Sequence, residues 1–363
     1  MSNSAVARTH RRPPNLVAGH HHKRRKNCLN AVDLSNSKGF NQTVGVHRTE
    51  TFGDAMRGNK ATALTVAEKC KNILASNWQG HLSTIKADSK GSKGDIHSSK
   101  VKYMVKRGKP YIWVPETDMH NVNTVIDERG SLAVATPFPG PLANLLKSLK
   151  KFPSRIALTG DVLPLKDQKA QLASECLKEL IHSEVEVIRE SSYAVSGVLS
   201  STNPVLTSRS ENLHELLDES QKHAIYKFDI RSCTFLDGNG GTHEVDLEVI
   251  QTTKTDILAP FSAMLVDGIN QSESRRRALV LFCFTYLNAP VSDAYMLSLD
   301  QKGFDILGKV PGPSLQDGSR QYQWRDFRFS FKEEALDIES FCRQLVEMEE
   351  EAIKKVSTYS GLG

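Results

Sequence analysis

The stretch that decides the fold is KVKYMVKRGKPYIWV, Lys100–Val114. In its first half three apolar residues alternate with lysines, which is the period-two pattern of a strand with one face in water. Arg107–Pro110 supplies turn residues, and the apolar run Tyr111–Val114 leads the chain back. We therefore predict an antiparallel β-hairpin at the centre of the first folded unit.

The same alternation recurs on both sides of this hairpin, interrupted by short helical patterns. An amphipathic helix is expected at 61–76, a short helix at 117–126, and further helical patterns at 142–149 and 167–181. Six or so antiparallel strands with flanking helices indicate a closed or partly closed barrel, because closure removes exposed strand edges. Further strands are expected at 82–87, 132–134, 156–160, 224–230 and 245–249.

The last hundred residues form a second pattern. Helical spacing fills 258–269 and 275–287, three strand-like segments follow, and 333–356 is an amphipathic helix. We expect an α+β protein of three parts: a leader at 1–58, a barrel domain at 59–255 and a C-terminal α+β domain at 256–357.

The leader differs from the rest in charge. Residues 1–32 contain no Asp or Glu and seven Lys or Arg, so the net charge of +5 for the whole chain leaves −2 for the remainder. This composition is typical of an organellar transit peptide. The alternative for Lys23–Lys26 is a nuclear signal or nucleic-acid patch, but a near-neutral folded part gives no support for nucleic-acid binding. His20–His22 lies in the same leader, and we interpret it as incidental.

Residue counts argue against two other classes of protein: membrane-spanning proteins, and proteins stabilised by disulfides or by cysteine-bound zinc. No run of 18 apolar residues occurs, so we expect no membrane span. The six cysteines form no CxxC pair and lie mostly in apolar settings, which indicates reduced core residues and neither a disulfide framework nor a zinc site.

The order of the segments carries a resemblance. The segments are Gly80–Ile85, Gly94–Tyr103, Gly108–Ile112, His120–Asn123, Arg129–Val134 and Arg155–Asp161. Over residues 65–255 this series resembles the FMN-binding split barrel of the pyridoxamine-phosphate-oxidase superfamily, closest to its HugZ-type haem-degrading branch. The C-terminal part is similar to that of HugZ-type proteins and of a plant glutamyl-tRNA-reductase-binding protein. With a plastid leader, the resemblance implies plant tetrapyrrole metabolism in the chloroplast stroma.

The resemblance also implies where a ligand binds. In this superfamily the ligand occupies a cleft between two barrels of a homodimer. The matching residues on this chain are Ser99, Lys100, Tyr103, Trp113 and His120, with Arg155 on a neighbouring strand. We expect the aromatic Tyr103/Trp113 hairpin to offer surface to the second subunit. Lys147, Lys150 and Lys151 could steer an anionic tetrapyrrole towards the cleft.

Two cofactors are compatible with such a cleft, and neither is fully matched. FMN needs several cations for its phosphate, but this chain has Asp118 where the resemblance implies a basic pair. Haem needs an axial ligand, and the C-terminal histidine of HugZ-type enzymes is missing, since no His follows His243. We therefore predict His120 as the axial haem ligand, with His97 and His81 as lesser candidates. The alternative for His120 is a capping or dimer-contact residue.

The function expected from the sequence is haem binding, with oxidative haem degradation as the activity. One alternative is an FMN-dependent oxidoreductase. A second is a non-catalytic regulator that contacts a tetrapyrrole-synthesis enzyme. No Ser/His/Asp triad or metal-ligand cluster is apparent, and Gly238–Gly241 is interpreted as a hairpin turn, because no helix is expected after it.

Residues 1–58 should be dispensable for folding, because they lack any hydrophobic period that could bury a core. Limited proteolysis followed by mass spectrometry should leave a stable fragment that begins near residue 60. A stable fragment that begins before residue 30 would contradict the prediction.

Overall fold

The computed structural model describes residues 63–88, 94–138, 140–198, 209–218, 222–314 and 320–359. All of them belong to one compact unit, Phe52–Gly363. The leader predicted at 1–58 lies outside the described residues, and so does the His20–His22 tract.

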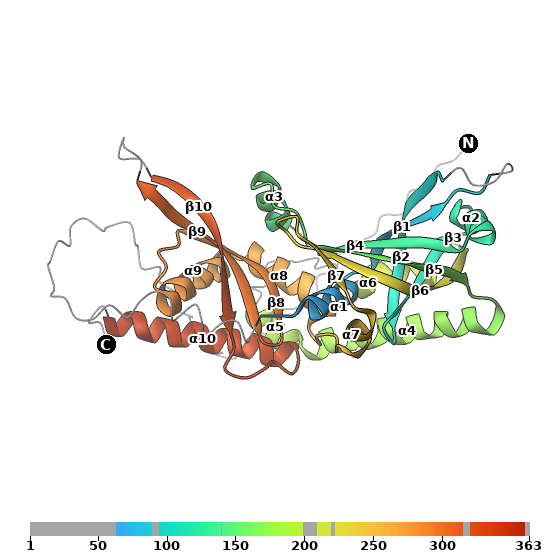
Figure 1. The fold of residues 1–363 in the computed structure, drawn as a ribbon. Coiled ribbons are helices and arrows are strands. Elements are labelled where there is room, and N and C mark those ends of the chain that lie inside the picture. Colours follow the sequence, from blue (N-terminus) through green and yellow to red (C-terminus); the bar gives the residue numbers. More distant parts are fainter. Residues whose placement is uncertain are drawn as a thin grey trace, which may run out of the picture. The chain divides into compact units, whose positions relative to one another are not determined.

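Six antiparallel strands close into a barrel (Figure 1). Their order is β3-β2-β1-β4-β5-β6, and β3 pairs with β6 to complete the circle; β7 (Thr242–Val245) adds to the outer part of β6. This confirms the α+β fold with a split barrel that the sequence predicts. The barrel strands are β1 Gln79–Ile85, β2 Ile96–Lys106, β3 Lys109–Pro115, β4 Arg129–Ala135, β5 Arg155–Pro164 and β6 His223–Leu236.

The predicted hairpin is β2 and β3, and its alternation sets the inner face of the barrel. Val101 and Tyr103 are buried inside, whereas Lys100 is exposed on the other face. The Tyr103 hydroxyl donates a 2.9 Å hydrogen bond to the carbonyl of Leu74 in helix α1 (Val66–Ser76). Helix α1 thereby contributes to the barrel core together with the inward-facing strand residues.

The outer face of the hairpin is covered by helix α4, Asp167–Glu190, which continues nine residues beyond the expected end at 181. Trp113 packs with Leu177 of this helix and Leu213 of α6 (Arg209–His214), and it is only 3% exposed. The expectation that Tyr103 and Trp113 offer an aromatic surface to a second subunit is therefore wrong: both side chains are buried within the chain.

The C-terminal part is a three-stranded antiparallel sheet with helices, as predicted. Its strands lie in the order β10-β9-β8, and stacked rings such as Phe304 and Phe329, 5.3 Å apart, pack in its core. Side chains of the earlier helices α3 (Gly140–Ser148) and α5 (Ser192–Val198) join the same core, so the predicted boundary at 255/256 stays a prediction. The elements are η3 Ala259–Phe261, α8 Ser262–Gln271, α9 Glu273–Leu287, β8 Asp293–Asp300, β9 Gly303–Ser314, β10 Arg320–Ser330 and α10 Ile338–Tyr359.

One strand prediction is wrong. The alternation at 245–249 does not continue β7, which ends at Val245. Asp246 accepts a hydrogen bond from the backbone N–H of Glu248 and so caps a helix, α7 (Leu247–Thr252). A capping Asp before an apolar residue favours a helix start over strand continuation. The remaining helices are α2 His120–Ile126, α3 Gly140–Ser148, α5 Ser192–Val198 and η2 Glu215–Leu217.

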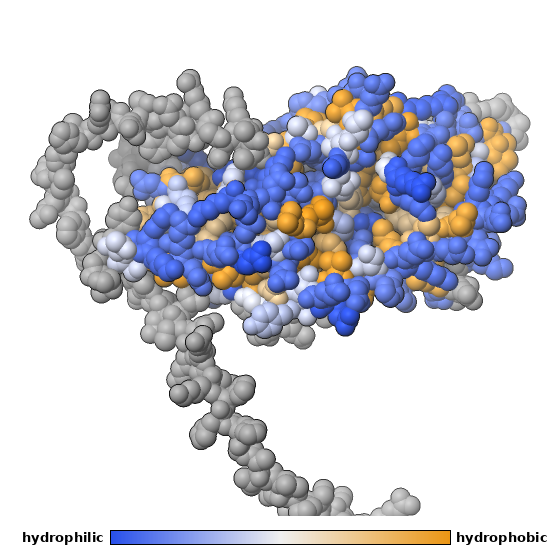
Figure 2. Space-filling model, turned by 90° about the horizontal axis from the view of Figure 1, so that it is seen from below, coloured by the Kyte–Doolittle hydropathy of each residue, from blue (hydrophilic) through white to orange (hydrophobic). Residues whose placement is uncertain are grey.

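No described helix is both long and apolar enough to span a membrane. Figure 2 shows one face of the molecule, on which hydrophobic residues form separate patches between hydrophilic ones. Five of the six cysteines are described and all five are free; Cys28 lies outside the described residues.

Replacing Trp113 by Ala should lower the free energy of unfolding by about 3–5 kcal/mol, because it leaves a cavity between the hairpin and α4. Chemical denaturation followed by circular dichroism measures this. Lys100→Ala, on the exposed face of the neighbouring strand, is the control and should change the value by no more than about 0.5 kcal/mol. A loss below about 1 kcal/mol for Trp113→Ala would contradict the packing.

Candidate functional site

The structure brings two of the predicted ligand residues close to His120: Ser99 and the lesser axial candidate His97, whose ring centroid is 4.5 Å from that of His120. Ser99 lies on the inner face of β2 and contacts His120 directly. Lys100 is exposed on the opposite face of the same strand, and Arg155 is exposed at the start of β5. Tyr103 and Trp113 are buried in two different cores. The ligand contacts predicted for these residues stay predictions.

His120 is the first residue of α2, and its ring lies inside the protein with no exposed surface. Its Nδ1 is 2.8 Å from Thr84 Oγ1 on β1, and its Nε2 is 3.1 Å from Ser99 Oγ on β2. Asn123 Nδ2, one helical turn further on, donates to Thr84 Oγ1 at 2.9 Å. Both ring nitrogens are thus engaged by side chains of the barrel wall.

A carboxylate joins this network from the turn before α2. Asp118 Oδ1 is 3.0 Å from His97 Nε2 and accepts the backbone N–H of His120 at 2.9 Å. Its Oδ2 accepts from Ser99 Oγ at 3.1 Å. Since the single hydroxyl proton of Ser99 goes to Asp118, Ser99 Oγ must accept from His120 Nε2–H. This assigns the proton of neutral His120 to Nε2, with Thr84 donating to Nδ1.

The charges of the cluster follow from burial. Burial lowers the pKa of His120, and the neighbouring Asp118 opposes this without overcoming it. Burial acts to raise the pKa of Asp118, but the bonds from the His120 backbone and from His97 outweigh it and hold the pKa below its usual value. The cluster therefore contains an ionised Asp118 beside a neutral His120 near neutral pH.

This geometry limits what His120 can do as an iron ligand. A haem outside the barrel could reach its Nε2 only if this nitrogen left Ser99 Oγ, and the buried imidazole would have to turn towards the surface. The axial role stays a prediction, and the described conformation does not favour it. His97 is the more accessible imidazole, with 26% of its side chain exposed, and His81 is exposed on β1.

A separate cleft offers more room. It has a volume of about 480 Å³ and is lined by segments of α1, the β4–α3 and α3–β5 connections, the β6–β7 turn, α8 and the C-terminal sheet. This volume lies within the usual range for small-molecule sites, roughly 300–1,000 Å³. Its apolar lining is Leu64, Ile73, Phe138, Leu146, Phe152, Phe235, Val266, Leu297 and Leu299.

Three cations also line the cleft: Lys69, Lys151 and Arg328. Arg328 is bound to Asp300 at 2.7 Å, and Lys151 Nζ is 2.9 Å from Asp326. Lys69 is exposed, and its charge opposes the rise that burial causes in the pKa of Asp305. Of the cleft residues, the sequence signalled only Lys151, as one of three lysines after an apolar helix; Lys69 and Arg328 come from distant segments that only the fold brings together.

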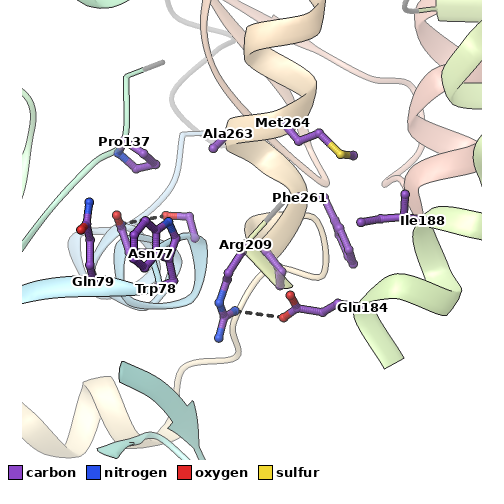
Figure 3. A pocket seen from close by; sticks show the side chains of 12 residues that line it. Asn77, Trp78, Gln79, Pro137, Glu184, Ile188, Arg209, Phe261, Ala263 and Met264 are labelled. Carbon is purple, nitrogen blue, oxygen red and sulfur yellow. Dashed lines mark hydrogen bonds and ion pairs between the residues drawn. The ribbon is translucent and has the colours of Figure 1, made fainter. Parts of the chain in front are cut away.

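A smaller cavity, of about 100 Å³, lies beside the buried ion pair of Arg209 and Glu184 (Figure 3). Arg209 Nη1 is 3.2 Å from Glu184 Oε1 and donates to the carbonyl of Ala75 at 2.6 Å. Burial raises the pKa of Glu184, and the charge of Arg209 opposes this rise. The pair ties α4, α6 and α1 together, and we interpret it as structural.

Comparisons with known proteins give structural similarities at low sequence identity. No family model matches the chain, and no curated protein does. Among solved structures, the chain is similar to a heme binding protein from Mycobacterium smegmatis, with 17% sequence identity and a TM-score of 0.46. The match covers 80% of this chain and 99% of that chain. It is also similar to ChuZ from Campylobacter jejuni, with 10% identity and a TM-score of 0.34 over 54% of this chain and 66% of that chain. A third similar structure is HutZ, the heme storage protein from Vibrio cholerae, with 9% identity and a TM-score of 0.31 over 47% of this chain and 94% of that chain. At these distances, no ligand transfers to this chain.

Thr84→Val should destabilise the protein by about 1–3 kcal/mol, because the buried His120 Nδ1 and Asn123 Nδ2 lose their hydroxyl partner. Thermal or chemical unfolding measures the loss. The matched control is Thr159→Val, since Thr159 bonds Ser232 through its hydroxyl on an exposed face, and it should cost under about 0.5 kcal/mol. Equal effects of the two substitutions would contradict the role of the Thr84 hydroxyl.

Proposed function

We propose that the protein binds haem in the 480 Å³ cleft. The observation that carries the proposal is the combination of a large apolar lining with cations at the same cleft. A porphyrin is a flat apolar ring with two carboxylates at one edge, so it needs apolar walls and a basic rim. Phe138 and Phe152 supply aromatic surface, and Lys69 and Lys151 supply ammonium groups for propionates.

The charge of the cleft favours a ligand with two separate carboxylates at one edge over a ligand with a compact phosphate dianion. Four lining carboxylates, Asp237, Asp300, Asp305 and Asp326, stand against three cations. FMN would place a phosphate dianion in this setting, which needs several unpaired donors. The propionates of haem can instead lie at the edge of a cleft, where solvent screens the remaining carboxylates.

The lining fits the ring better than it fits the iron. No described residue that lines the cleft is a His, Cys, Met or Tyr, the side chains that usually hold haem iron. The finer proposal is that haem is a substrate for oxidative breakdown, which is the activity that the sequence resemblance implies. The residues of the cleft would bind and orient the ring.

The proposal extends to assembly and location. Five apolar side chains on α2 and the start of β2 are between 49% and 80% exposed: Ile96, Met119, Val122, Val125 and Ile126. Helix α2 carries no Asp, Glu, Lys or Arg, so two copies could contact each other there without repulsion between like charges. A homodimer through this face, in the chloroplast stroma, is the finer form of the proposal. Light scattering should then give about twice the 40.3 kDa chain mass.

Haem titration of the purified full-length protein tests the proposal. A Soret band should develop with one haem per chain, and Phe152→Ala or Lys69→Ala should weaken binding about tenfold, equivalent to ~1.4 kcal/mol. Tyr193→Ala is the control, because Tyr193 is 90% exposed and does not line the cleft. Yellow protein with flavin bands would support the FMN alternative. Binding of neither ligand would favour the non-catalytic regulator.

His120→Ala separates the cleft from the axial ligand predicted from sequence. With haem in the cleft, the Soret maximum of the folded variant should match the wild type. A shifted Soret maximum, with a loss of haem affinity of about tenfold or more, would identify His120 as the axial iron ligand. His97→Ala is the matched control for the neighbouring imidazole.

A further inference from the structure

We propose that His97, Asp118 and His120 form a binding site for a divalent transition-metal ion, with zinc as the ion that fits best. The site is separate from the haem proposal, because none of the three residues lines the cleft. One ligand atom from each of the three lies within 4.8 Å of the other two.

The fold brings these ligands together from two elements. His97 lies on the inner face of β2, and Asp118 and His120 flank Met119 at the start of α2. His97 Nε2 is 3.0 Å and His120 Nε2 is 4.0 Å from Asp118 Oδ1. A tetrahedral zinc ion with bonds of about 2.0–2.1 Å holds its ligand atoms roughly 3.3 Å apart, so shifts on the order of 1 Å would close the site.

The ligand types suit zinc and related ions. Zn²⁺ binds both imidazole nitrogen, a borderline donor, and carboxylate oxygen, a hard donor. Ca²⁺ and Mg²⁺ prefer ligand sets made of oxygen alone. Three protein ligands leave a fourth position for water. His97 and Asp118 keep 26% and 18% of their side chains exposed, so solvent can reach this position.

The surroundings of His120 are those of an oriented ligand. Metal-binding histidines usually donate their second ring N–H to a fixed partner. Here Nδ1 faces Thr84 Oγ1, Asn123 Nδ2 fixes that oxygen, and Asn123 Oδ1 is held by the backbone N–H of Ala87 at 2.9 Å. Ser99 can keep its bond to Asp118 Oδ2 and leave Oδ1 for the metal.

Binding has a defined proton balance. Metal coordination needs the lone pair of each Nε2, so the neutral His120 moves its ring proton from Nε2 to Nδ1, where Thr84 Oγ1 accepts it. His97 Nε2 lies 3.0 Å from the ionised Asp118 Oδ1 and donates to it, so His97 must likewise move its ring proton from Nε2 to Nδ1. Asp118 is already ionised, and no oxidant or reductant is required.

The test is zinc titration against a chromophoric chelator, with full-length protein in which His20, His21 and His22 are replaced by Ala. Those three histidines could bind zinc themselves and would mask the site. This chain should bind one equivalent of Zn²⁺, and Co²⁺ in its place should show the visible bands of a tetrahedral complex. No bound equivalent would overturn the proposal.

Variants then locate the site. His97→Gln keeps a donor for Asp118 but is a poor zinc ligand, and it should lose at least tenfold in zinc affinity, as should Asp118→Asn. Thr84→Val should weaken zinc binding roughly 10–100-fold through the orientation of His120. The matched control is His243→Gln. His243 pairs with Asp237 at 3.3 Å but has no third ligand residue beside it, so this variant should bind zinc with wild-type affinity.

Unfolding temperatures show which variants are folded. His97 is partly exposed, so His97→Gln remains informative even if Asp118→Asn does not fold. Wild-type zinc affinity in folded His97→Gln would overturn the proposal, and the cluster would then be a hydrogen-bond network only.

Discussion

The pairing of β3 with β6 is the constraint on which the rest of the structure depends. Five residue pairs, from Tyr111 opposite Lys227 to Pro115 opposite His223, turn an open sheet into a closed barrel. Closure leaves one face of every barrel strand inside, which fixes Tyr103 in the core and places His97 and Ser99 on the same wall as Thr84. The same closure turns Trp113 outward, where α4 covers it.

The barrel also explains why two chemically different sites can coexist. The polar cluster is built from β1, β2 and α2, and its side chains satisfy one another with short bonds. The cleft lies where residues beside β4, β5 and β6 meet α8 and the C-terminal sheet, and its walls are largely apolar. A directional, hydrogen-bonded cluster suits a small cation, whereas a wide apolar cleft suits a large flat ligand.

The local sequence pattern was sufficient to predict much of the fold, but it predicted few of the residues at the two candidate sites. The alternation around Tyr103 predicted the hairpin, because period two is set by neighbouring residues. The same alternation failed at 245–249, where Asp246 caps a helix. His97 and Ser99, two apart on one strand, share a face, and that spacing was the available signal for the cluster. The burial of His120 depends on Thr84, 36 residues away, and no local pattern encodes such a contact.

The crystal structure of the protein grown with haem tests the central claim most directly. We predict density for the ring in the cleft, against Phe138 and Phe152, with its carboxylates near Lys69 or Lys151. His120 should remain bonded to Thr84 and Ser99. Density for the ring at α2, with iron bound by His120, would contradict it.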